Sequence, residues 1–69
     1  MEILERFGKR LRERRVAFGL SQEKFAAKCG LDRTYISGIE RGQRNISLRN
    51  IQTIAKALET SISELTQGL

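Results

Sequence analysis

Apolar residues recur along this chain at intervals of three and four positions, which is the spacing of one face of an α-helix. No segment alternates apolar and polar residues in the way that a half-buried β-strand does. The first apolar stripe consists of Ile3 or Leu4, Phe7, Leu11 and Phe18. It predicts a helix over residues 2–18, with the following glycine suited to the left-handed residue that ends it. The pattern therefore favours an all-α fold.

A hydrophobic staple then occurs three times, in which an apolar residue precedes a capping residue and a second apolar residue follows the cap by four positions. The staples are Leu20, Ser21 and Phe25; Leu31, Asp32 and Ile36; and Ile46, Ser47 and Ile51. A capping box at Ser61 and Glu64 opens a further helix. With Gly30 and Gly42 as helix ends, these signals predict helices over residues 22–29, 33–41, 48–58 and 62–67. We expect one compact five-helix domain over residues 1–69.

The second and third predicted helices are joined only by residues 30–32, with Gly30 at the corner. A connection this short makes the two helices cross steeply, as in a helix-turn-helix. Ala26 is small enough for one helix to pack closely over the other. We interpret Cys29 as a small buried hydrophobe, with a redox role as the alternative. The residues expected to point inward are Phe25, Cys29, Leu31, Ile36 and Ile39.

Five residues of the 33–41 helix are expected on its outer face: Arg33, Thr34, Ser37, Gly38 and Arg41. In the major groove of DNA, arginine can donate two hydrogen bonds to guanine O6 and N7, and a threonine methyl can touch a thymine methyl. This face therefore predicts contacts with bases. Gly38 would let the helix approach a base edge that a larger residue would push away. The alternative for Gly38 is close helix packing inside the protein.

Polar groups on both sides of this face are suited to DNA phosphates. Gln22 stands at the positive end of a predicted helix, where its amide and the free backbone N–H groups can bind an anion. The ring of Tyr35 can pad the edge of the core while its hydroxyl reaches a phosphate or a base. The loop that follows adds Arg41, Gln43, Arg44 and Asn45. We expect these residues to contact the DNA backbone, and the alternative for the loop is an ordinary solvated segment.

Composition narrows the function further. Thirteen Lys and Arg residues against eight Asp and Glu residues give a net charge of +5, which favours a polyanionic partner such as nucleic acid. The basic run over residues 6–15 is interpreted mainly as a solvated helix face. A chain with one cysteine and no histidine has too few ligands for zinc and cannot form an internal disulfide. We therefore expect no metal and no cofactor.

Other classes of protein are disfavoured as well. No pair of carboxylates stands in an apolar setting beside an obvious nucleophile, so we do not expect an enzyme. No apolar run is long enough for a membrane span or a signal peptide, which favours a cytoplasmic protein.

Arg15 lies near the apolar stripe of the first predicted helix, where a lone charge is costly. Its side chain can extend to solvent, or it can pair with Glu40 near the end of the third predicted helix. Pairing is the hypothesis that a denaturation experiment can test.

Three stretches, GLSQEKFA (19–26), GLDRTYISGIERG (30–42) and NISLRNI (45–51), resemble the helix-turn-helix of lambda-repressor-like (XRE) transcription regulators. The resemblance covers residues 7–65. Within that family, DRTYISGIERGQRN followed by ISL is most similar to the controller proteins of bacterial restriction–modification systems, which are small stand-alone dimers.

The resemblance implies a sequence-specific regulator that binds double-stranded operator DNA as a homodimer and controls restriction–modification genes. It puts the 33–41 helix in the major groove, with Arg33, Thr34 and Ser37 toward the bases. It puts the six residues already assigned to the backbone on the strands: Gln22, Tyr35, Arg41, Gln43, Arg44 and Asn45. Arg15 and Glu40 fall where the family often has an ion pair. Some relatives carry a long base-reading side chain in place of Gly38, so DNA shape is expected to matter more there.

The helices predicted over 48–58 and 62–67 carry more apolar residues than one helical face needs. We predict a dimer interface formed by Ile46, Leu48, Ile51, Ile62 and Leu65, and the alternative is that most of these residues close the core. RNA polymerase is a further candidate partner. Two other functions stay open, an antitoxin or adaptor that acts mainly through protein binding, and the DNA-binding half of a longer repressor. An antitoxin often has an additional tail, whereas this chain stops about two residues after its last predicted helix.

Overall fold

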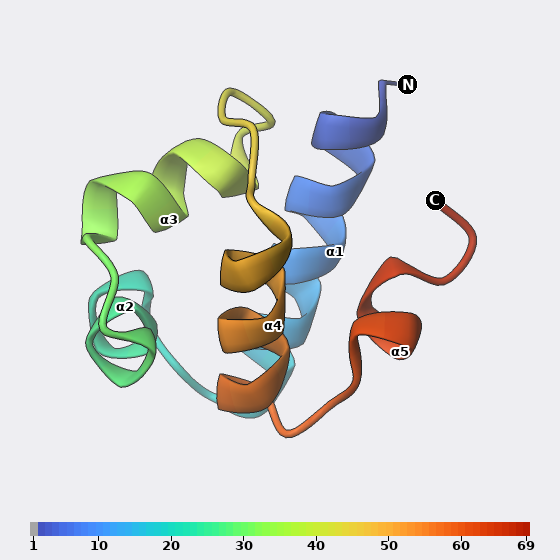
Figure 1. The fold of residues 1–69 in the computed structure, drawn as a ribbon. Helices are drawn as coiled ribbons and strands as arrows, with labels where there is room; N and C mark the ends of the chain where they lie inside the picture. Colours follow the sequence, from blue (N-terminus) through green and yellow to red (C-terminus); the bar gives the residue numbers. More distant parts are fainter. Residues whose placement is uncertain (1) are drawn as a thin grey trace.

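The computed structural model describes residues 2–69, and these residues form five helices (Figure 1). They are α1 (Ile3–Phe18), α2 (Gln22–Cys29), α3 (Arg33–Glu40), α4 (Leu48–Ala57) and α5 (Ile62–Thr66). No strand occurs within residues 2–69. The predicted all-α fold is therefore confirmed, and each predicted helix end lies within one residue of the observed one. None of the helices in residues 2–69 is both long and apolar enough to cross a membrane.

The predicted capping residues explain why the helices begin where they do. The side-chain oxygens of Ser21, Asp32, Ser47 and Ser61 each accept a hydrogen bond from a backbone N–H in the first turn of α2, α3, α4 and α5. Such a cap contributes about 1 kcal/mol relative to alanine. Gly19 and Gly30 end α1 and α2 in the left-handed conformation, with φ of 87° and 69°. Local chemistry thus fixes the helix boundaries before any tertiary contact is considered.

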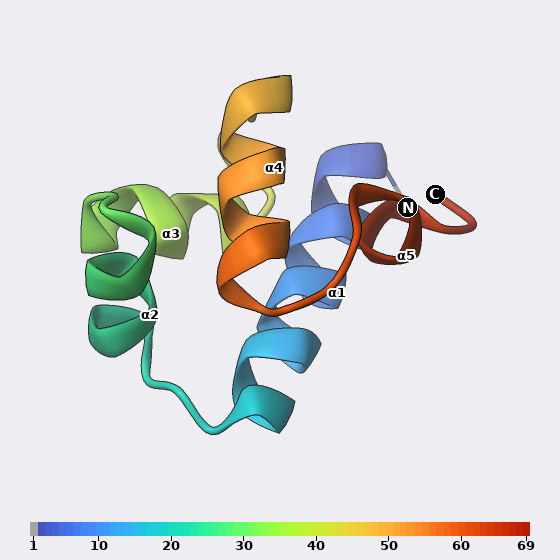
Figure 2. The ribbon, with the colours of Figure 1, turned by 60° about the horizontal axis from the view of Figure 1, so that its bottom comes forward.

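The core lies where α1, α2, α3 and α4 meet, and α5 closes it by packing against α1 and α4 (Figures 1 and 2). Its fully buried side chains come from all five helices: Leu11, Phe25, Ile36, Ile39, Ile54 and Leu65. The predicted inward residues of α2 and α3 are confirmed, since Cys29 and Leu31 are half-buried against the same cluster. Burial raises the pKa of the Cys29 thiol, although the nearby Lys28 ammonium opposes this shift.

Both ends of the predicted apolar stripe lie outside the core, since Ile3 is 52% exposed and Leu4 does not pack against the buried cluster. Phe18 is 39% exposed at the last position of α1. The Lys28 ammonium stands 4.2 Å from the centroid of its ring. A cation–π contact at the surface therefore takes the place of apolar packing at this end of α1.

Gly8 sets how closely α1 and α3 approach each other. A Cβ atom added at Gly8 would lie 2.7 Å from the carbonyl oxygen of Glu40 and closer still to that of Ile39. Both obstacles are backbone atoms of the last turn of α3, so they cannot turn aside. Glycine at position 8 is therefore required by the crossing of these two helices.

We expect Gly8→Ala to lower the free energy of unfolding by about 1–3 kcal/mol, because the added methyl overpacks the crossing. Gly38→Ala is the matched control. Its Cβ would meet only the side chain of Arg44, at 2.7 Å from Cγ, and Arg44 is exposed. The gain in helix propensity, about 1 kcal/mol, offsets the displacement of that side chain. Urea denaturation that shows equal changes for the two variants would contradict this account of the crossing.

Candidate nucleic-acid interface

The turn between α2 and α3 directs one face of α3 away from the core. The N–H of Leu31 donates to the Ala26 carbonyl at 3.0 Å, which closes the end of α2. Asp32 then caps α3 immediately. Ile36 and Ile39 are buried, whereas Arg33 and Thr34 at the start of α3 are exposed. The predicted helix-turn-helix is present in this geometry (Figure 1).

Side chains on the outer face of α3 form local hydrogen bonds with one another. The Thr34 hydroxyl donates to Asp32 Oδ1 at 2.6 Å. Arg41 Nη1 donates to Ser37 Oγ at 3.0 Å, and Arg41 Nε donates to Gln43 Oε1 at 3.3 Å. Hydrogen bonds from the Thr34 hydroxyl and from the Thr34 backbone N–H lower the pKa of the Asp32 carboxyl, which is therefore ionised at neutral pH. The structure thus brings the predicted reading residues together on one exposed surface.

Gly38 does not lie on this exposed surface, and the expectation that it faces outward is wrong. It is buried, and an added Cβ would lie 2.7 Å from Cγ of Arg44. The loop after α3 turns back, so the Arg44 side chain covers the glycine. The neighbour that covers Gly38 is a side chain of the loop, so the alternative of close packing between helices does not describe this contact either.

The predicted backbone-contact residues surround the C-terminal end of α3. Arg41, Gln43, Arg44 and Asn45 are all exposed in the loop. The guanidinium of Arg44 lies 5.7 Å from the centroid of the Tyr35 ring. The Tyr35 hydroxyl accepts a hydrogen bond from Asn50 Nδ2 at 3.0 Å, which ties α3 to α4. The ring of Tyr35 thus packs at the edge of the core as predicted, with cationic and amide groups beside it.

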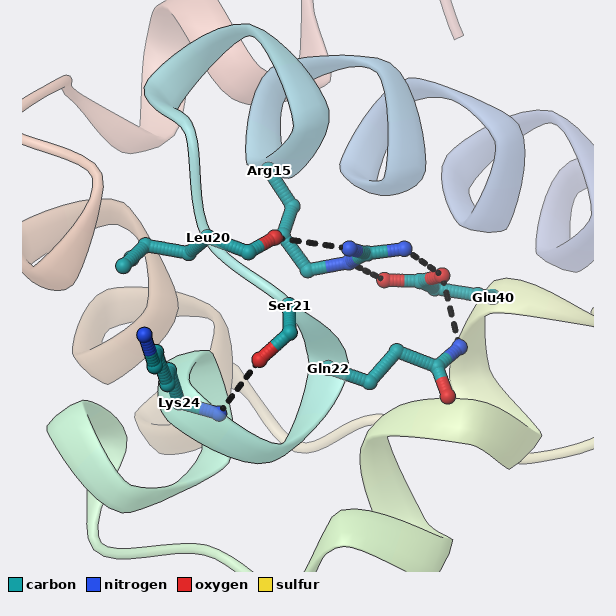
Figure 3. A network of polar contacts seen from close by, with 6 residues as sticks. All are labelled: Arg15, Leu20, Ser21, Gln22, Lys24 and Glu40. Carbon is teal, nitrogen blue, oxygen red and sulfur yellow. Dashed lines mark hydrogen bonds and ion pairs between the residues drawn. The ribbon is translucent and has the colours of Figure 1, made fainter.

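Arg15 and Glu40 form a buried bidentate ion pair, as hypothesised (Figure 3). Arg15 Nε and Nη2 donate to Glu40 Oε2 and Oε1 at 2.6 and 3.0 Å. The side chains are only 9% and 2% exposed. The hydrogen bond to Glu40 raises the pKa of Arg15, although burial opposes this shift. A permanent charge pair therefore joins α1 to the last residue of α3.

Two further groups complete this pair. Arg15 Nη1 donates to the Leu20 carbonyl at 2.8 Å, and Gln22 Nε2 donates to Glu40 Oε1 at 3.0 Å (Figure 3). Gln22 is the first residue of α2, so the network also fixes where α2 begins relative to α3. An amide NH₂ carries two donors, and one of them remains available to a phosphate. Gln22 is thus held in place by the ion pair.

The predicted dimer residues do not share one surface. Leu65 is 0% exposed, so its assignment to a dimer interface is wrong, because α5 uses it to close the core. Leu48 is 72% exposed, and it lines a hollow of about 420 Å³ with Arg49, Gln52 and Ile62. Ile46 and Ile51 line a second hollow of about 340 Å³ beside α1. Apolar surface therefore remains on α4 and α5 after the core is complete.

The sequence reasoning missed several contacts. The interior glycine at position 8 of a predicted helix was a usable signal for close packing. The bond from Asn50 to Tyr35 and that from Arg10 Nη1 to the Leu65 carbonyl, at 3.2 Å, had no local signal. They join segments whose proximity only the tertiary fold establishes.

Comparison with known proteins identifies the class to which this fold and surface belong. A family model described as helix-turn-helix matches residues 11–65. The chain is 49% identical over 65 residues to the control protein C.MunI from Mycoplasma sp, which covers 93% of this chain and 88% of C.MunI. The fold and the exposed face of α3 thus define a DNA-binding transcriptional regulator of the helix-turn-helix type.

Two crystal structures carry the likeness further. The restriction–modification controller protein C.AhdI from Aeromonas hydrophila is 58% identical, with a TM-score of 0.87 over 90% of each chain. The controller protein C.Esp1396I, seen as a tetramer in complex with its natural 35 base-pair operator, is 38% identical with a TM-score of 0.85, over 94% of this chain and 86% of that one. The chain belongs to the helix-turn-helix family of restriction–modification controller proteins.

Neutralising one partner of the buried pair should destabilise the whole domain. We expect Glu40→Gln to lower the free energy of unfolding by about 3–5 kcal/mol, because it leaves the Arg15 charge buried without a counter-charge. Glu23→Gln at an exposed position of α2 is the matched control and should change stability by less than about 0.5 kcal/mol. Reversing both charges, with Arg15→Glu and Glu40→Lys together, should be less damaging than Glu40→Lys alone. Additive losses in urea denaturation would rule out the coupling.

Proposed function

We propose that the protein regulates restriction–modification genes by binding operator DNA as a homodimer, with α3 in the major groove. The observation that carries this proposal is the exposed first turn of α3. Arg33 and Thr34 are exposed there, while Ile36 in the next turn is fully buried. A recognition helix presents its N-terminal residues to base edges in this way. The complex of the relative C.Esp1396I with its natural operator supports operator DNA as the partner.

Residues around the C-terminal end of α3 would position the helix on the duplex. Gln22 lies there, bonded to Glu40, and the loop of residues 41–45 follows directly. In this assignment Tyr35 contacts the strand together with Arg41, Gln43, Arg44 and Asn45. Such contacts give affinity and register without reading sequence. Base readout is then assigned to Arg33, Thr34 and Ser37, with no direct contact from the covered Gly38.

Dimerisation would use the apolar surface left on α4 and α5. Leu48 and Ile62 both line one hollow, and the exposed Leu48 side chain would insert into the same hollow of a second copy. An isologous contact of this kind is typical of twofold dimers. It would present two recognition helices to half-sites about 34 Å apart, one turn of DNA. Ile46 and Ile51 stand at the edge of this proposed interface.

We expect Leu48→Glu to weaken dimerisation at least tenfold, because it introduces a charge at the centre of an apolar contact. The monomer should stay folded, since Leu48 is 72% exposed. Val16→Glu on α1, where the wild-type residue is 58% exposed, is the matched control and should leave association unchanged. Sedimentation equilibrium measures both. The proposed interface fails if Leu48→Glu associates like the wild type.

Selection of bound sites from random DNA tests the function itself, and it should return a paired, symmetric site. Arg33→Ala should then reduce affinity by about 1–3 kcal/mol and relax the preference at one base pair of each half-site. Arg44→Ala should weaken all sequences alike and lower the salt slope by about one, because it removes a phosphate contact. If both variants lower affinity equally for every sequence, the reading face has been wrongly assigned. If the wild type prefers no sequence, the proposed function itself fails.

A further inference from the structure

The Thr34 and Ser37 hydroxyl groups on the outer face of α3 are not free to rotate. A threonine or serine hydroxyl can ordinarily turn to donate to one base or to accept from another. On this surface, however, each hydroxyl of α3 is engaged by a charged neighbour, Thr34 by Asp32 and Ser37 by Arg41. The charge of each neighbour decides which half of the hydrogen-bonding capacity remains for DNA.

At Thr34 the direction of the bond is unambiguous. The ionised Asp32 carboxylate can only accept, so the single hydroxyl hydrogen of Thr34 is committed to Asp32 Oδ1 at 2.6 Å. The same oxygen accepts from the Thr34 backbone N–H at 2.8 Å, which fixes the residue from two sides. A bond this short is typical of charge-assisted hydrogen bonds from a hydroxyl to a carboxylate. What Thr34 has left to offer is an oxygen that accepts and a methyl group.

At Ser37 the direction is reversed. The Arg41 guanidinium can only donate, so Ser37 Oγ accepts its hydrogen bond at 3.0 Å. The hydroxyl hydrogen of Ser37 therefore stays free to donate. Neighbouring turns of one helix thus present opposite hydrogen-bonding polarity.

We propose that Asp32 is a positioning residue for base recognition, which makes Thr34 an obligate acceptor and so selects a base with an exocyclic amino group. This inference rests on the proposed function and deepens it. In the major groove only adenine N6 and cytosine N4 carry such a donor, whereas guanine offers N7 and O6 acceptors. Thr34 therefore excludes guanine from contact with its oxygen, while the free donor of Ser37 suits guanine or thymine O4.

Helix capping alone does not require this arrangement. Serine or asparagine at position 32 would cap α3 about as well as aspartate. A carboxylate at a surface that meets phosphates also opposes DNA binding by charge repulsion. The carboxylate is explained by what it does to Thr34: it sets the rotamer before binding, so less rotamer freedom remains to be lost in the complex.

Three variants separate positioning from capping. Asp32→Ser retains a cap for α3 but releases the Thr34 hydroxyl. Thr34→Val keeps the methyl and the shape of the side chain but removes the oxygen. Asp32→Asn keeps an acceptor oxygen and removes only the charge. Thermal denaturation should show similar melting temperatures for wild type, Asp32→Ser and Asp32→Asn, as expected if each residue caps α3.

The readout is the relative affinity for four operators that differ at the base pair where Thr34→Val changes the selected sequence. Wild type should prefer one base at least about fivefold. That preference should fall below about twofold in Asp32→Ser and in Thr34→Val, and combining the two changes should lower it no further. Asp32→Asn should keep only part of the wild-type preference, because its amide can donate to the Thr34 hydroxyl as well as accept from it, while binding all sequences more tightly. Replacing a selected adenine by purine, which lacks the amino group, or a selected cytosine by an analogue without N4, should reproduce the loss with wild-type protein.

The assignment to Asp32 is overturned if Asp32→Ser keeps the base preference. It is also overturned if Asp32→Asn loses as much of that preference as Asp32→Ser does. Indifference of the wild type to loss of the amino group overturns the assignment of Thr34 as an acceptor. Arg33→Ala distinguishes these results from failure of the proposed function. If Arg33→Ala relaxes the base preference while Asp32→Ser does not, α3 reads DNA without any positioning of Thr34 by Asp32.

Discussion

The buried pair of Arg15 and Glu40 is the constraint on which the placement of α3 depends. It connects α1 to the last residue of α3, and through Gln22 it also holds the first residue of α2. Two ions out of water are tolerated because each guanidinium nitrogen of Arg15 and each carboxylate oxygen of Glu40 has a hydrogen-bond partner in this network. The position of α3 is therefore set by polar contacts at its C-terminal end as well as by the apolar packing of Ile36 and Ile39.

Much of the fold was predictable from the sequence, because the residues that start and end its helices act locally. A cap such as Ser21 or Ser47 and a terminating glycine such as Gly30 act within one turn of chain, so reading them in order gives the helix boundaries. Periodicity was less reliable at the ends of helices. Phe18 has the spacing of a core residue but lies partly exposed at the end of α1, with the Lys28 ammonium over its ring.

The candidate site, too, was predictable from the sequence only in part. Exposure of Arg33, Thr34 and Arg41 followed from helical spacing once Ile36 and Ile39 were taken as buried, and exposure of Gln43, Arg44 and Asn45 followed from their polar character. Gly38 and Leu65 were misplaced because their surroundings are supplied by distant or flexible segments: a loop that folds back in one case, and the packing of α5 against α1 and α4 in the other. Hydrogen-bonding polarity at Thr34 and Ser37 could not be read from spacing, because it depends on which charged neighbour each hydroxyl meets.

The contact at Gly8 has a consequence for how such a protein can diverge. Because α1 rests on the carbonyl groups of the last turn of α3, any side chain at position 8 would act as a wedge beneath α3. The wedge would tilt α3 and, in the proposed complex, alter the angle at which α3 enters the major groove, without changing any residue assigned to DNA contact. A mutation hidden between two helices could in this way retune operator choice.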